Sequence, residues 1–330
     1  MFGKLMNNYY YGKSGKGDYK RDDLPRNRWQ LFWEMLRIRL SGLFRLNLMT
    51  AIAFLPLIYV LVVMVNALFS HLVGLSEVVA DPEQAALAAE VIKESPNQIY
   101  SILFSALVMA IPAIAITGPV QAGMAYITRN WARDEHAFIW ADFKDAVKEN
   151  WKQALGVSII TGLAPIIMLV CWQYYGGMAQ TSSMLYVVPQ VLTMALGIIW
   201  MMSLVFMYPM MVTYKMNLRT VIRNSLLLTI GRLPQTAGVR LVMLVPTLIA
   251  VLVAFYTPYM MYALMALAGY YILLGNALAR FVQASFTNAT FDRFINPRIA
   301  GVEVNRGLSS EEEDDEEEEE DEAQPVEQAR

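Results

Sequence analysis

Long apolar segments alternate with short charged segments along most of the chain. A helix needs about 20 apolar residues to cross the hydrocarbon core of a bilayer, and six segments meet this length. They cover residues 46–70, 98–128, 155–175, 184–214, 238–257 and 260–282. They lack the alternation of apolar and polar residues that is typical of membrane β-strands. The hydrocarbon core also contains no water to hydrogen-bond with unpaired backbone N–H and C=O groups, so helices are favoured. The pattern therefore predicts an all-α fold, a polytopic transmembrane helical bundle of about six spans.

The charged segment between the second and third spans has a helical pattern of its own. Its apolar residues recur at spacings of three, four and four, which places them on one helical face. They are Trp140, Phe143, Val147 and Trp151, while Lys144 and Lys148 fall on another face. Placing its six charges at the bilayer centre would cost on the order of 15 kcal/mol, at about 2.5 kcal/mol each. We therefore expect residues 138–152 to form an in-plane cytoplasmic amphipathic helix, with its apolar face available for docking.

Two further basic, amphipathic segments precede spans, at residues 30–45 and 217–236. Each of the three segments leads into a span that contains a proline, namely Pro56, Pro165 or Pro246. Three related units, each with an interfacial helix and a kinked span, would explain this arrangement. Chance convergence of basic helices beside a membrane would explain it equally well.

The distribution of lysine and arginine predicts the orientation in the membrane. Ten occur up to Arg45 and five in residues 129–152, but only one in residues 71–97 and none in residues 176–183. By the positive-inside rule, both termini are expected in the cytoplasm. The expected divisions are a basic segment 1–28, a membrane domain 29–285 and a cytoplasmic tail 286–330. Within the membrane domain we expect an extracytoplasmic loop 71–97, with a short helix starting at Asp81, and a cytoplasmic loop 129–153.

Composition supports a membrane protein and singles out the C-terminal end. The 330 residues are 56% hydrophobic and 17% charged, whereas soluble domains carry about 25% charge. Residues 311–322 are twelve consecutive acidic residues, whereas the rest of the chain has a net positive charge. This tail is expected to be a solvated, disordered segment, and docking onto a basic surface is the alternative. The single cysteine, Cys171, excludes an intramolecular disulfide and favours a buried apolar role.

The sequence offers little material for catalysis. The predicted spans contain no Asp, Glu, His or Lys, and their arginines, Arg240 and Arg280, are expected to extend toward the cytoplasmic surface. His71 and His136 fall on opposite sides of the membrane, and no catalytic motif occurs, so we expect neither an enzyme nor a metal or other cofactor.

Uncharged polar residues in the spans suggest a pocket instead. Gln121, Gln190 and Tyr208 are candidates for lining it. Structural hydrogen bonding across helices is the simpler interpretation of these residues. Prolines expected to kink the helices are Pro56, Pro112, Pro119, Pro165, Pro209 and Pro246.

Three segments resemble the YesL-like membrane protein family, also called the domain-of-unknown-function 624 family. They are "GPVQAGMAYITRNWARDEHAFIWADFKDAVKENWKQAL", "RNSLLLTIGRLPQT" and "YYYGKSGKGDYKRDDLPRNRWQLFWEMLRIRLSGLFRLNLM". The likeness covers about residues 8–285, and the tail from Ser309 departs from it. The resemblance implies a multi-pass protein of a bacterial plasma membrane and supplies no catalytic residues.

Genes of this family often lie beside genes for carbohydrate uptake and breakdown. We therefore expect a non-enzymatic accessory or regulatory protein, whose partners are the lipid bilayer and ABC-type sugar transporter subunits, with no nucleic acid. The alternative is a transporter membrane subunit that itself binds a small uncharged solute such as a sugar.

Overall fold

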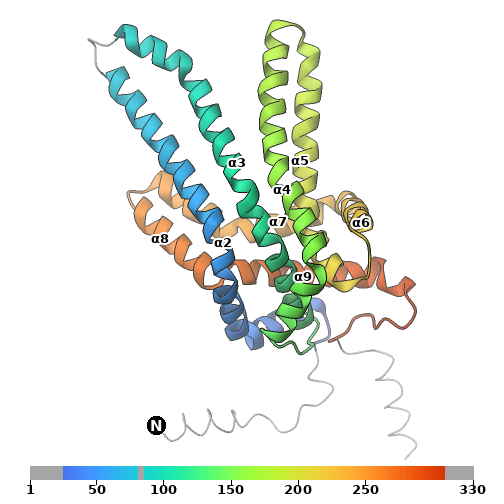
Figure 1. The fold of residues 1–330 in the computed structure, drawn as a ribbon. Helices are drawn as coiled ribbons and strands as arrows, with labels where there is room; N and C mark the ends of the chain where they lie inside the picture. Colours follow the sequence, from blue (N-terminus) through green and yellow to red (C-terminus); the bar gives the residue numbers. More distant parts are fainter. Residues whose placement is uncertain (1–24, 81–84, 309–330) are drawn as a thin grey trace, which may run out of the picture.

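The computed structural model describes residues 25–80 and 85–308, and in these residues the chain is helical without strands (Figure 1). The longer helices are α2 (Arg28–Ala80), α3 (Ala85–Trp131), α4 (Ala141–Thr181), α5 (Val187–Thr213), α6 (Leu218–Gly231), α7 (Leu233–Tyr256), α8 (Met260–Tyr270) and α9 (Asn276–Phe294). Short elements are η3 (Met184–Tyr186), the π-helical turn η4 (Tyr271–Gly275) and η5 (Asn296–Arg298). Six helical segments are long and apolar enough to cross a bilayer, which confirms the all-α class and the six expected spans.

Two helical hairpins give the molecule its shape. The α2–α3 hairpin and the α4–α5 hairpin share a base and diverge away from it (Figure 1). A helix rises 1.5 Å per residue, so the 53 residues of α2 extend about 80 Å, well beyond the roughly 30 Å of a hydrocarbon core. Large parts of these helices therefore extend beyond the bilayer core.

The helices are more continuous than the sequence predicts. Most of the expected loop 71–97 is helical, because α2 continues to Ala80 and α3 begins at Ala85. The helix start expected at Asp81 lies outside the described residues. The expected cytoplasmic loop 129–153 is reduced to residues 132–140 between α3 and α4. The tail expected from residue 286 is also too long, because α9 runs to Phe294.

The predicted in-plane helix 138–152 is not a separate element. Its residues from Ala141 onward form the first turns of α4, which continues through the apolar span to Thr181. The Asp142 carboxylate accepts the backbone N–H of Phe138 at 2.8 Å and so holds the start of this helix. Helical periodicity predicts a face but not a break, and nothing between 152 and 155 interrupts the helix.

Only the third amphipathic segment forms a short helix of its own. The Asn217 side chain caps α6 by accepting the backbone N–H of Thr220 at 2.9 Å. The helix ends at Arg232, where the backbone leaves helical geometry, and Pro234 then opens α7. The three amphipathic segments therefore differ in structure, which leaves the hypothesis of three related units without support from their connections.

The prolines expected to kink the spans all lie within continuous helices, so the second span is not broken. These are Pro56 in α2, Pro112 and Pro119 in α3, Pro165 in α4, Pro209 in α5 and Pro246 in α7. Figure 1 shows that α3 changes direction close to its N-terminal end, the part that contains Pro96. This bend agrees with the helix distortion that proline causes.

Small residues allow α3 and α4 to approach closely. A methyl group added at Gly118 would lie 2.5 Å from the backbone oxygen of Ala154. The Ser158 hydroxyl crosses this interface and donates to the carbonyl of Ala115 at 3.1 Å. Such contacts stabilise helix pairs in lipid, where the hydrophobic effect no longer drives association.

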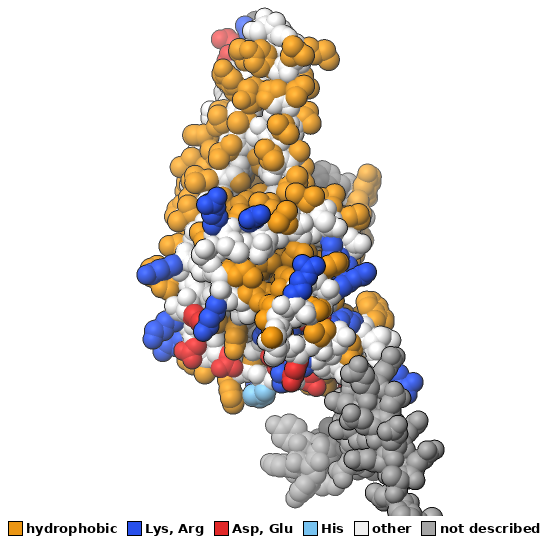
Figure 2. Space-filling model, turned by 90° about the vertical axis from the view of Figure 1, so that its right-hand side faces the viewer, with side chains coloured by type: hydrophobic (Ala, Val, Ile, Leu, Met, Phe, Trp, Pro, Cys, Tyr) orange, Lys and Arg blue, Asp and Glu red, His pale blue; other side chains and the backbone are white. Residues whose placement is uncertain are grey.

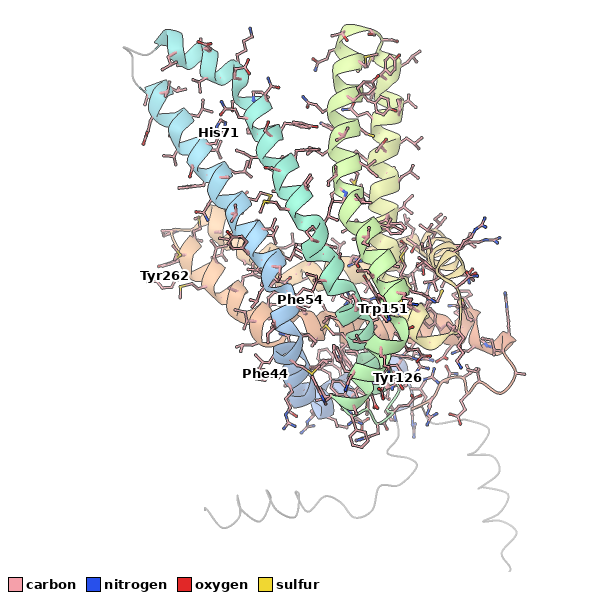
Figure 3. All side chains as sticks on the ribbon, in the orientation of Figure 1. Phe44, Phe54, His71, Tyr126, Trp151 and Tyr262 are labelled. Carbon is pink, nitrogen blue, oxygen red and sulfur yellow. The ribbon has the colours of Figure 1, made fainter. Side chains whose placement is uncertain are left out.

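The core lies at the shared base, and the protruding hairpins expose apolar side chains. One buried cluster joins α2, α3 and α9 through residues such as Leu43, Met124 and Phe281. Figure 2 shows hydrophobic side chains over the upper hairpin, with lysine, arginine and acidic residues gathered on the lower half. Figure 3 places His71 in the upper part of α2 and Tyr126 near the base, where α3 ends, five residues before Trp131. The apolar upper surface is the part suited to contact with lipid.

Candidate functional site

The strongest polar contacts inside the helical body centre on Arg280 of α9. This guanidinium donates to the side-chain oxygen of Gln121 on α3 and, at 2.7 Å, to that of Gln283. It also lies 5.3 Å from the ring centre of Tyr208 on α5, in a cation–π arrangement. Gln283 in turn donates to the backbone oxygen of Val205 at 2.6 Å. Arg280 thus links α9 to α3 and α5.

The predicted pocket of Gln121, Gln190 and Tyr208 is brought together only in part. Gln121 and Tyr208 both contact Arg280, but Gln190 lies 18 residues before Tyr208 on α5, about 27 Å along the helix. Gln190 instead donates to the backbone oxygen of Trp172 at 3.2 Å, between α5 and α4. The Gln121 amide nitrogen is also occupied, since it donates to Thr117 at 2.9 Å. These polar groups satisfy one another rather than facing a shared cavity.

A second buried amide stabilises the irregular turn η4. The fully buried Asn47 of α2 donates to the backbone oxygens of Tyr271 and Ile272 at 2.9 and 2.7 Å. Its own oxygen accepts the backbone N–H of Ala277 at 2.9 Å. A π-turn leaves backbone groups without their usual helical partners, and in lipid they must be paired by protein. Asn47 therefore makes this turn possible and attaches α2 to it.

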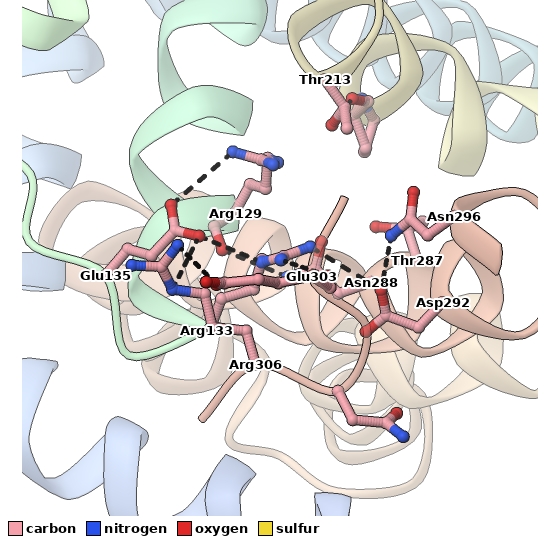
Figure 4. Close-up of polar contacts among 12 residues, drawn as sticks. Arg129, Arg133, Glu135, Thr213, Thr287, Asn288, Asp292, Asn296, Glu303 and Arg306 are labelled. Carbon is pink, nitrogen blue, oxygen red and sulfur yellow. Dashed lines mark hydrogen bonds and ion pairs between the residues drawn. The ribbon is translucent and has the colours of Figure 1, made fainter. Parts of the chain in front are cut away.

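Ion pairs join the ends of the described chain at the base (Figure 4). The buried Asp292 of α9 pairs with Arg28 at 2.5 Å and lies 3.7 Å from Arg133, which follows α3. Arg133 also pairs with Glu135 at 3.2 Å. Glu135 is shared further with Arg306 at 3.5 Å, so the segment after α9 returns to this cluster. Buried carboxylates require such partners, and here they come from three distant parts of the chain.

A phenol extends this cluster toward α5. The Tyr214 hydroxyl donates to the side-chain oxygen of Asn296 at 2.6 Å, and Asn296 donates to Asp292. Burial raises the pKa of the Tyr214 phenol above its ordinary value, with the Asp292 charge adding to the effect. The phenol therefore stays protonated and remains a donor at physiological pH. The cluster holds helices together, and none of its groups is placed as an activated nucleophile.

The predicted docking face of α4 divides into a packed half and an exposed half. Phe143 and Val147 pack toward Gly123 of α3, where an added methyl group would lie within 3 Å of both side chains. Trp140 and Trp151 remain 67% and 45% exposed. Figure 3 shows Trp151 on the lower part of α4. The flexible Lys152 ammonium lies 5.6 Å from the Trp151 ring centre, and Lys144 and Lys148 are exposed along the same turns. Two indoles beside lysines thus remain available for lipid or a partner.

Comparison with known proteins gives one match. Residues 98–172 match the family model described as Protein of unknown function, DUF624. The resemblance expected from the sequence is therefore confirmed over this segment. Searches of curated proteins and of solved structures found no match.

The DUF624 segment supplies only half of the polar site. It contains Gln121, the arginines at the end of α3, and the exposed Trp140 and Trp151. Arg280 and Asp292 come from α9, outside the matched residues. The sequence did not predict the contacts of these two residues because their partners are far along the chain. Arg280 is the one charged residue in a long uncharged stretch, which is a signal in the sequence, whereas Asp292 stands beside Arg293 and gives none.

Proposed function

We propose that this chain is a non-enzymatic accessory or regulatory component of a carbohydrate uptake system in a bacterial plasma membrane. The observation that carries this proposal is that Trp140 and Trp151 are exposed at the start of a helix whose Phe143 and Val147 pack against α3. Tryptophan is enriched among residues that dominate binding interfaces. The partner surface would be a membrane subunit of the sugar importer, met at the cytoplasmic side.

The internal polar groups favour this proposal over solute binding. Arg280 occupies the side-chain oxygens of Gln121 and Gln283, and Gln190 lies far from them. A sugar site needs several convergent polar groups that are free to bind hydroxyls. In the described part of the chain, Gln121 and Tyr208 already contact Arg280, and Gln190 donates to a backbone oxygen. The link to carbohydrate uptake itself rests on the gene neighbourhoods that the family resemblance implies.

Affinity purification from native membranes in a mild detergent tests this proposal. The expected result is recovery of permease or ATPase subunits of a sugar importer with the tagged full-length chain, identified by mass spectrometry. Recovery of the chain without any importer subunit would contradict the accessory role. Calorimetric titration of the purified chain with sugars is the companion measurement, and saturable sugar binding would support the solute-binding alternative instead.

A further inference from the structure

A groove lies between the end of α6 and the end of α9. Its volume is about 450 Å³, and it is open to the outside. The residues that line it include Leu227, Leu228, Arg232, Phe294 and Arg298. Neither the polar cluster around Arg280 nor the exposed tryptophans of α4 contribute to it. The groove combines apolar walls with two arginines and contains no acidic residue.

The apolar walls of the groove continue into the exposed apolar surface of the molecule. Leu227 is 58% exposed and Phe294 38% exposed. Ile230 and Leu233, next to the groove on the same connection, are also exposed. A chain-like apolar ligand could therefore enter the groove from the side that faces lipid. A purely polar ligand would leave these walls uncovered.

The arginines give the groove an unbalanced positive charge. Arg232 lies against the rings of Phe286 and Phe294, at 5.3 and 5.6 Å, and donates to Thr290 at 2.8 Å. Within residues 25–80 and 85–308, no acidic side chain forms an ion pair with Arg232 or Arg298. Burial lowers the pKa of Arg232, and the charge of Arg293 lowers it further. An anion at this position would offset both effects.

We propose that the groove binds an anionic phospholipid, with an acyl chain along Leu227, Leu228 and Phe294 and the phosphate at Arg232 and Arg298. Basic pockets beside transmembrane helices recognise lipid headgroups in this way. The chain's own acidic run at 311–322 offers the negative charge but no apolar groups to cover the walls. A phospholipid supplies both parts. This site is independent of the proposed link to sugar uptake.

Titration of the purified full-length chain with dioleoyl-phosphatidylglycerol, followed by native mass spectrometry, tests the site. Arg232→Gln with Arg298→Gln should weaken binding of the first lipid by about ten-fold or more. Arg219→Gln with Arg223→Gln is the matched control, because it removes two exposed charges from α6 without touching the groove. The control should weaken binding by about three-fold at most. Equal losses in both pairs would show only general attraction and would overturn the proposal.

A single variant and a neutral lipid distinguish loss of the site from loss of folding. Arg298→Gln alone changes an exposed side chain and should itself weaken binding, even if the double variant folds poorly. Dioleoyl-phosphatidylcholine should bind the wild type and the variants alike, because it has no net charge. If the wild type binds phosphatidylglycerol only after deletion of residues 311–330, the acidic tail is the occupant and the lipid proposal is wrong.

Discussion

Arg280 on α9 donates a hydrogen bond to Gln121 on α3, across 159 residues of sequence. The contact joins the DUF624 segment to the last long helix and makes the two packing partners interdependent. It also occupies the side-chain oxygen of Gln121, which would otherwise be free to accept a hydrogen bond from a solute hydroxyl. The polar interior of this protein is therefore understood most simply as structural.

The Gln121–Arg280 contact predicts non-additive effects on stability. Gln121→Leu leaves the Arg280 guanidinium short of an acceptor, and hydrogen bonds to charged groups contribute about 1.5–3 kcal/mol. Arg280→Met should cost a similar amount, because it leaves Gln121 and Gln283 unpaired. The double variant should cost less than the sum of the two, by about 1 kcal/mol. Thermal unfolding in detergent measures this coupling, and strict additivity would show that the contact contributes nothing.

Asn47→Leu should destabilise the protein strongly. It removes the partners of two part-buried carbonyls and one buried N–H at the π-turn, and a buried group left unpaired costs about 1–3 kcal/mol. Asn66→Leu on the same helix is the control, because Asn66 is exposed and bonds only to the carbonyl of Val62 within its own helix. The melting temperature should fall for the first variant and stay nearly constant for the second. A similar small change in both would mean that the η4 carbonyls find other partners.

Gly118→Ala should separate α3 from α4. The added methyl group would meet the Ala154 backbone oxygen at 2.5 Å, and backbone cannot move aside cheaply. Overpacking of this kind costs about 1–3 kcal/mol. Gly177→Ala is the matched control on α4, since nothing lies within 4 Å of its added methyl group. Unfolding midpoints in detergent should separate the two variants, and an unaffected Gly118→Ala protein would argue against the close approach.

The sequence predicts the membrane-crossing helices well, because their length and apolar composition are local properties. It does not predict how α4 begins, since the spacing of Trp140 to Trp151 defines a helical face whether or not the helix continues into the span. It does not predict the partner of Arg280, because Gln121 lies far along the chain. Gln190 was grouped with Tyr208 by residue type alone, and the length of α5 separates them.

The orientation predicted from lysine and arginine is open to a direct test. A reporter fused after Gln180, at the end of the α4–α5 hairpin, should be extracytoplasmic. A reporter fused after Leu308, at the shared base, should be cytoplasmic, because the basic residues gather on that half of the molecule. Alkaline phosphatase and green fluorescent protein fusions report the two sides. The reverse pair of results would place the exposed tryptophans of α4 outside the cell and exclude a cytoplasmic docking role.

The most direct test of the account is the role of Trp140 and Trp151 in partner binding. Trp140→Glu with Trp151→Glu should reduce importer subunits recovered with the chain by at least about thirty-fold, since each interfacial tryptophan contributes about 2 kcal/mol or more. Lys144→Gln with Lys148→Gln, on the same turns, should reduce recovery by about three-fold or less, because exposed charges contribute little. Both pairs should accumulate in the membrane like the wild type, since these side chains are exposed. Equal recovery of importer subunits with the tryptophan pair and with the wild type would contradict the docking surface proposed here.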